Sequence, residues 1–145
     1  MSWKDKCAAA LGEMRLYENS GHKTRFMELM ECYSGYPFFT KGLCKCMYLS
    51  AWDEEHFAIM LEMLTSMALG EEHDTEDMKF QGDVIADEKI DEHACGEAYV
   101  FKLSGMFLEG DPGVPEGREK LSAEYEYIVS RALEASRVID HLTDR

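Results

Sequence analysis

The feature that most constrains this chain is a long apolar stripe near its carboxyl end. Apolar residues repeat there at alternating steps of four and three positions, at Leu121, Tyr125, Ile128, Ala132, Ala135, Ile139 and Leu142. This is the spacing of one face of an α-helix, and it predicts a single amphipathic helix from Glu116 to Leu142. The stripe is wider than a two-stranded seam, because it also includes Val129, Leu133 and Val138. The helix is therefore expected to pack inside a bundle.

Helical periods and capping residues predict five more helices. They extend from Trp3 to Glu18, from Thr24 to Tyr33, from Pro37 onward, from Ser50 to about Gly70 and from Ala94 to Leu108. The last of these is apolar on nearly all sides, which is typical of a central buried helix. No segment shows the alternation of a β-strand. The sequence therefore predicts an all-α fold, a bundle of five or six helices that ends with the long amphipathic helix.

Length and composition fit a single domain that spans residues 1–145. A chain of 145 residues with 46% hydrophobic and 30% charged residues can bury one core without disulfides. No stretch of about 18 apolar residues is present, so we expect neither a membrane helix nor a signal peptide. The five cysteines are odd in number and irregularly spaced. We therefore expect reduced thiols, most of them small core residues, in a cytoplasmic protein.

Negative charge is concentrated in the middle of the chain. The formal net charge is −14, and residues 51–117 carry three Lys and Arg against eighteen Asp and Glu. A surface of this sign repels phosphate, which disfavours nucleic acid as a partner and favours a basic one. The alternative is a solvated face that only aids solubility.

Two segments are candidates for contact with a partner. The first is aromatic, and its candidate residues are Tyr36, Phe38, Phe39 and Tyr48. They lie in or beside the third predicted helix, which has too few polar residues to cover a solvated face. We expect them to form a partly exposed interface with another protein or with a second copy of the chain. The second segment is acidic, and its candidate residues are Glu71, Glu72, Asp74, Glu76, Asp77, Asp87, Glu88, Asp91 and Glu92.

Patterns for metal binding are incomplete. Two histidine–carboxylate pairs stand at helical spacing, Asp53 with His56 and His93 with Glu97. They could hold a metal if two helices brought them together, but the repeated Glu-x-x-His of two-iron bundles is absent. The segment from Asp77 to Glu88 aligns with a calcium loop, yet Lys79 occupies a ligand position in that alignment. We therefore predict no metal and no cofactor.

Nucleophile patterns are equally incomplete. Cys44 and Cys46 are two residues apart, and so are His93 and Cys95. Side chains at that spacing point in different directions on a helix, so neither pair forms a reactive dyad. We therefore predict no catalytic residues.

One segment has the spacing of a helix-turn-helix. It consists of the helix from Thr24 to Tyr33, a turn at residues 34–36 and the helix that follows Pro37. Lys41 and Lys45 would be the only basic residues on its recognition helix, which is few for a DNA-binding module. An ordinary helical hairpin is the preferred interpretation.

Together these observations favour a noncatalytic protein–protein interaction module. Three alternatives stay open. One is an acidic inhibitor that imitates nucleic-acid charge and occupies the groove of a basic enzyme, of the kind that phages and mobile elements encode. The others are a metal- or small-molecule-binding bundle and a helix-turn-helix transcription regulator. The long C-terminal helix is expected to be scaffold, so function should lie on the aromatic or the acidic segment.

Overall fold

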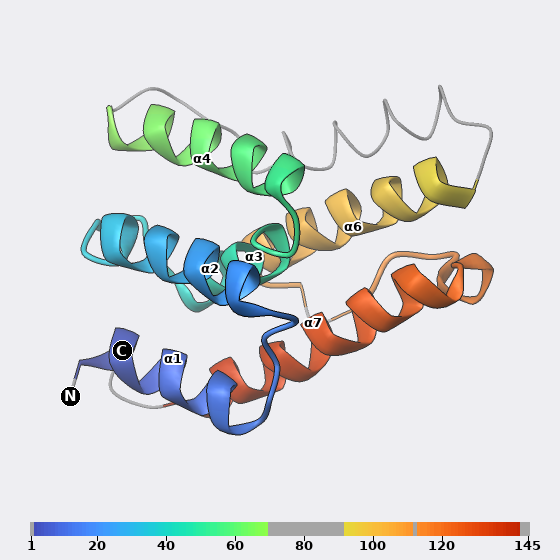
Figure 1. Cartoon of the computed structure of the whole chain (residues 1–145). Helices are drawn as coiled ribbons and strands as arrows, with labels where there is room; N and C mark the ends of the chain where they lie inside the picture. Colours follow the sequence, from blue (N-terminus) through green and yellow to red (C-terminus); the bar gives the residue numbers. More distant parts are fainter. Residues whose placement is uncertain (1, 70–91, 112, 143–145) are drawn as a thin grey trace.

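The computed structural model describes residues 2–69, 92–111 and 113–142 (Figure 1). These residues form six α-helices and one short 3₁₀ helix and contain no strand, which confirms the all-α prediction. The elements are α1 (Trp3–Glu13), α2 (Ser20–Tyr33), α3 (Lys41–Ser50), α4 (Glu54–Ala68), α6 (Glu92–Glu109), the 3₁₀ helix η1 (Arg118–Lys120) and α7 (Ala123–His141). None of the helices described is both long and apolar enough to cross a membrane.

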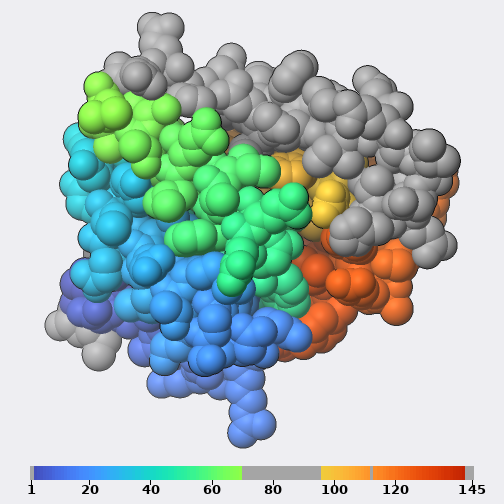
Figure 2. Space-filling model, turned by 45° about the horizontal axis from the view of Figure 1, so that its top comes forward, coloured from blue at the N-terminus to red at the C-terminus, as the bar shows by residue number. Residues whose placement is uncertain are grey.

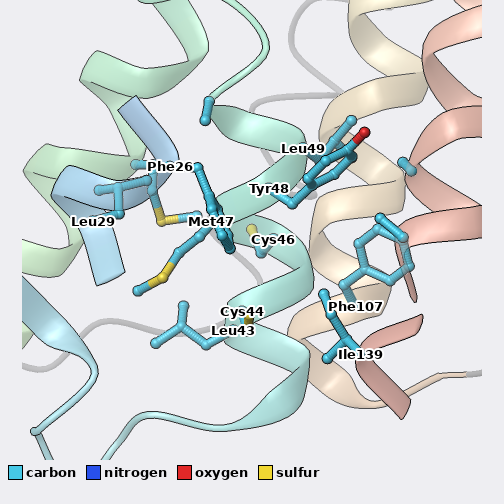
Figure 3. Close-up of a cluster of buried hydrophobic side chains, with 14 of the residues drawn as sticks. Phe26, Leu29, Leu43, Cys44, Cys46, Met47, Tyr48, Leu49, Phe107 and Ile139 are labelled. Atoms are coloured by element: carbon cyan, nitrogen blue, oxygen red, sulfur yellow. The ribbon is translucent and has the colours of Figure 1, made fainter. Parts of the chain in front are cut away.

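Helix α3 lies at the centre of the bundle. It packs against α2, α4, α6 and α7, and every residue from Leu43 to Ser50 except Lys45 is buried. In Figure 3 Met47 points toward α2, while Phe107 of α6 and Ile139 of α7 lie on the opposite side of α3. The sequence predicts α6 as the central helix; α6 is mostly buried, but the shorter α3 is the element that the others surround.

The remaining helices form a shell around α3. Helix α1 packs against α7, and α6 also packs against α7. Helices α2 and α4 contact each other and lie side by side on the face shown in Figure 2. The carboxyl end of α7 is fastened to α3, because the Lys41 ammonium donates to the Leu142 carbonyl at 2.6 Å and Lys45 pairs with Asp140 at 2.8 Å.

Two glycines allow close contacts between helices. A Cβ at Gly42 would overlap the carbonyl oxygen of Phe107, and a Cβ at Gly96 would overlap the ring of Tyr125. Gly96 therefore lets α6 approach α7 closely. Glycine is unfavourable inside a helix, but Gly42 is the residue that lets α3 reach α6.

Helices α2 and α3 do not begin where the sequence predicts. The side chain of Asn19 accepts the His22 backbone N–H at 2.9 Å, so α2 begins four residues before the predicted start. The hydroxyl of Thr40 accepts the Leu43 N–H at 3.0 Å, so α3 begins after Thr40 and not at Pro37. In both cases a capping side chain decides the boundary.

Helix α4 is capped by a different residue from the one predicted. Ser50 is the last residue of α3, and Asp53 itself caps α4 by accepting the His56 N–H at 2.8 Å. The buried face of α4 consists of His56, Met60, Met63 and Leu64. Leu61 lies outside this face and is 37% exposed.

Helix α1 ends five residues before its predicted end. Arg15 adopts a left-handed backbone conformation with φ of 56°, which stops the helix. The Leu16 N–H then bonds the Leu11 carbonyl and the Arg15 N–H bonds the Gly12 carbonyl, the pair of bonds of a Schellman motif. Leu16 is completely buried, so this turn is anchored in the core.

Helix α7 has the predicted buried stripe but a later start. Tyr125, Ile128, Ala132, Ala135 and Ile139 are all buried, as their spacing indicates. The helix begins at Ala123, because Gly117 with φ of 96° redirects the chain and η1 intervenes.

The cysteines are mainly core residues, as predicted. Cys7, Cys44 and Cys46 are buried thiols, and Cys32 is exposed. The side chain of Cys95 lies outside the described part of the chain. The prediction is therefore confirmed for three of the four cysteines described.

Candidate functional site

The predicted aromatic interface divides into a buried part and a surface part. Tyr48 is fully buried and donates a hydrogen bond to the Leu16 carbonyl, and Phe39 is 3% exposed. The prediction that these two residues belong to an exposed patch is wrong, because the other helices cover α3, which carries Tyr48, and Trp3 of α1 packs against Phe39. Tyr36 is 39% exposed and Phe38 is half-buried, so only these two reach the surface.

The two surface aromatics are held together in the connection between α2 and α3. The rings of Tyr36 and Phe38 stack with centroids 5.0 Å apart and planes at 15°. The Tyr36 N–H bonds the Tyr33 carbonyl, and the Phe39 N–H bonds the Tyr36 carbonyl, so the connection is folded into successive turns. Pro37 further restricts the backbone. These rings are therefore ordered before any partner arrives, which reduces the entropy lost on binding.

A groove runs between this connection and the first turn of α1. Its volume is about 430 Å³, and its lining residues are Ser2, Trp3, Lys4, Ser34, Gly35, Tyr36, Pro37 and Phe39. We call it the α1 groove. Trp3 meets Phe39 edge to face, with centroids 5.9 Å apart, so an aromatic wall continues into the core. Lys4 pairs with Glu31 at 3.0 Å and places charge at the rim.

Trp3 carries a polar group without a partner. The residue is 9% exposed, and its buried indole Nε1–H makes no hydrogen bond to the described residues. An unpaired buried donor costs about 1–3 kcal/mol. This donor lies inside the bundle, so the part of Trp3 that lines the α1 groove contributes an apolar surface.

The side chains of the predicted acidic segment lie outside the described part of the chain. Glu71, Glu72, Asp74, Glu76, Asp77, Asp87, Glu88 and Asp91 lie outside the described residues, and so does the aligned calcium loop. Glu92 begins α6, but its side chain is likewise outside the described part of the chain.

The histidine–carboxylate pairs come together only in part. The Nδ1 atom of His56 lies 4.0 Å from the Asp53 carboxylate, its Nε2 is buried without a hydrogen bond to the described residues, and its ring packs on Phe101. Burial, followed by the charges of Glu97, Glu124, Asp53 and Glu55, raises the pKa of Tyr125. Asp53 and Glu97 thus both lie near the phenol of Tyr125. The side chain of His93 is not among those described, and the described residues contain no group of three metal ligands.

The helix that would read DNA is not a surface helix. Helix α3 is covered by other helices, and its lysines are engaged at the end of α7, Lys41 with main-chain carbonyls and Lys45 with the Asp140 carboxylate. The connection from residue 34 to residue 40 is also longer than the predicted turn. Helix α3 therefore presents no basic surface that could contact DNA.

A buried histidine near α3 is a feature that the sequence does not reveal. His22 is completely buried; its Nδ1 accepts the Glu18 N–H at 3.0 Å, and its Nε2 lies 2.9 Å from the Tyr48 carbonyl. This pattern assigns the proton to Nε2. Burial lowers the pKa of His22 to about 4, and the positive charges of Arg25 and Arg131 act in the same direction. Its role is structural, because both ring nitrogens are engaged by the backbone.

Comparison with known proteins gives no guide to the site. No family model, curated protein or solved structure matches the chain. The functional assignment therefore depends on the chain's own geometry, in which the α1 groove places the exposed ring of Tyr36 beside the mostly buried rings of Trp3 and Phe39.

Proposed function

We propose that this protein is a noncatalytic protein-binding module whose α1 groove takes an apolar or aromatic side chain of a partner, with basic residues flanking that side chain. The observation that carries the proposal is the ordered aromatic wall formed by Trp3, Tyr36 and Phe39 in one groove. Tyrosine and tryptophan at such sites contribute most of the binding energy in many interfaces. The groove is also lined by the polar residues Ser2, Lys4 and Ser34, as is usual around the apolar centre of an interface.

The charge of the chain favours a basic partner. A net charge of −14 attracts basic surfaces and repels acidic ones over about 10 Å at 0.1 M salt. Association should therefore be faster with a basic partner, and the affinity should fall as ionic strength rises.

Site-specific photo-crosslinking tests the location. A benzophenone side chain at Tyr36 should capture the partner, whereas the same group at Tyr127 should not. Tyr127 is the matched control, because it is 47% exposed against 39% for Tyr36 and belongs to a separate surface beside Trp52 and Arg131. Equal capture at both positions would contradict the proposal.

Binding of the purified partner provides the quantitative test. Tyr36→Ala should weaken the affinity at least tenfold, or about 1.4 kcal/mol, whereas Tyr127→Ala should change it less than twofold. Trp52→Phe leaves Trp3 as the sole tryptophan of this chain, since the sequence has two. The fluorescence of that variant should shift to shorter wavelength when a partner without tryptophan binds. An unchanged emission together with an unchanged affinity of Tyr36→Ala would refute the groove as the site.

A further inference from the structure

Two buried cysteines from distant parts of the sequence lie in contact. The Sγ atoms of Cys7 in α1 and Cys44 in α3 are 3.7 Å apart, and both residues are completely buried. Cys44 also lies 3.9 Å from the Met30 sulfur. From this contact we infer that Cys7 and Cys44 are an oxidation site, a dithiol that hydrogen peroxide converts into an intramolecular disulfide between α1 and α3.

The geometry needs only a local adjustment. A disulfide bond is about 2.05 Å long, so the two sulfur atoms must approach by roughly 1.7 Å. Rotation of the two side chains and a small shift of α1 can supply this movement. Helix α1 is the element best able to shift, because it has 11 residues and lies at the edge of the bundle (Figure 1).

Other cysteines in the chain provide an internal comparison. Cys46 is as deeply buried as Cys44, but its sulfur lies 3.9 Å from the Ser50 hydroxyl in the same helix. Burial raises the pKa of the Cys46 thiol to about 12, which keeps it protonated. Cys32 is exposed on α2. Oxidation at Cys7 and Cys44 should therefore be distinguishable from oxidation that depends on exposure alone.

The chemistry is a two-electron oxidation that balances without a cofactor. When α1 opens transiently, a thiolate attacks one oxygen of hydrogen peroxide, the O–O bond breaks, and hydroxide takes a proton and leaves as water. The product is a sulfenic acid. The second thiol attacks its sulfur, the S–O bond breaks, and the oxygen leaves with the thiol proton as a second water. Two thiols and one peroxide thus become one disulfide and two waters.

The disulfide would fix the helix that carries one wall of the α1 groove. Trp3 and Cys7 are one helical turn apart on the buried face of α1. The inference does not depend on what the groove binds, since the contact between the thiols is independent of any partner.

Peptide mapping of the whole chain tests the inference. The reduced protein is treated with hydrogen peroxide, its remaining thiols are alkylated in denaturant, and it is digested with trypsin without reduction. Trypsin cuts after Lys6 and on both sides of residues 42–45, so Cys7 and Cys44 fall in peptides 7–15 and 42–45 while Cys46 falls in another. The expected product is a linked pair of these two peptides, lighter by about two hydrogens than their sum, with Cys46 alkylated.

Variants provide the control. Cys46→Ala should keep the linked peptides and Cys7→Ala should lose them, and the oxidised wild type should unfold at a higher temperature than the reduced wild type. The inference is overturned if peptides 7–15 and 42–45 are both recovered alkylated after enough peroxide to oxidise Cys32. Linkage of either one to the Cys32 peptide instead would overturn it equally. Because peptide mapping of the wild type decides the matter, the test stands even if Cys7→Ala does not fold.

Discussion

The buried histidine predicts a specific dependence of stability on pH. His22 is neutral in the folded chain, with a pKa of about 4, whereas an unfolded chain protonates it near pH 6.5. Between these values the unfolded chain therefore binds more protons than the folded one. The contribution of His22 to the free energy of unfolding should be complete above about pH 6.5 and should be lost progressively as the pH decreases toward 4.

The magnitude follows from the size of the pKa shift. Each pKa unit corresponds to about 1.4 kcal/mol, so the lowering from 6.5 to about 4 limits the loss to about 3 kcal/mol. About 2 kcal/mol of it should be lost between pH 7 and pH 5. This is a large part of the stability of a small domain, which is typically about 5–15 kcal/mol.

The assay is urea unfolding at several pH values for the wild type and His22→Gln. Glutamine offers a donor and an acceptor but does not titrate, so the variant retains every other source of pH dependence. Between pH 7 and pH 5 the free energy of unfolding of the wild type should fall by about 2 kcal/mol more than that of the variant. This difference does not depend on how much the substitution changes stability at neutral pH. Parallel curves for the two proteins would refute the argument, because they would show that His22 does not titrate differently in the folded and unfolded chains.

Two further predictions concern the contacts of α3. Gly42→Ala should lower the free energy of unfolding by about 2 kcal/mol or more because its methyl group would overlap the Phe107 carbonyl, whereas Gly35→Ala, which has open space, should change it by less than about 0.5 kcal/mol. Equal effects in urea titrations of the two variants would show that α3 and α6 can separate easily. Tyr48→Phe should cost about 1–3 kcal/mol by thermal or urea unfolding, because the Leu16 carbonyl loses its buried donor. A cost below about 0.5 kcal/mol would mean that this hydrogen bond adds nothing to stability.

The parts of the fold that depend on local period could be predicted from the sequence. The stripe of α7 and the apolar run of α6 repeat over enough turns to identify both helices and their buried residues. The ends of the helices could not be predicted in this way, because single residues determine where a helix begins or stops. Gly117 redirects the chain before α7, and Arg15 ends α1 in a conformation that arginine seldom adopts.

The burial of α3 could not be predicted in this way. Its apolar residues cover every side except the one that carries Lys41 and Lys45, and such a helix is either a central core element or an exposed patch that awaits a partner. Periodicity does not separate these cases. The choice depends on whether other helices cover both sides, which is a property of the tertiary fold, and Tyr48 is buried for this reason.

The α1 groove combines a part that sequence could predict with a part that it could not. Tyr36 and Phe38 stand out because aromatic residues beside a proline in a connection are candidates for an interface. The opposite wall comes from Trp3 and its neighbours, more than thirty residues earlier in the chain. No local pattern relates the start of α1 to the end of α2, so the groove exists only once the bundle has formed.

Helix α1 therefore connects the two proposals while keeping them separable. Its buried face presents Trp3 to the groove and, one turn later, Cys7 to α3, so the position of the groove wall depends on how firmly the helix is seated. Tyr36 is remote in sequence from both thiols and makes its ring contacts with Tyr33 and Phe38. Tyr36→Ala should then weaken binding without changing the disulfide, and Cys7→Ala should remove the disulfide while leaving the aromatic residues of the groove in place. If oxidation changed the affinity in the wild type but not in Cys7→Ala, the seating of α1 would be the physical link between them.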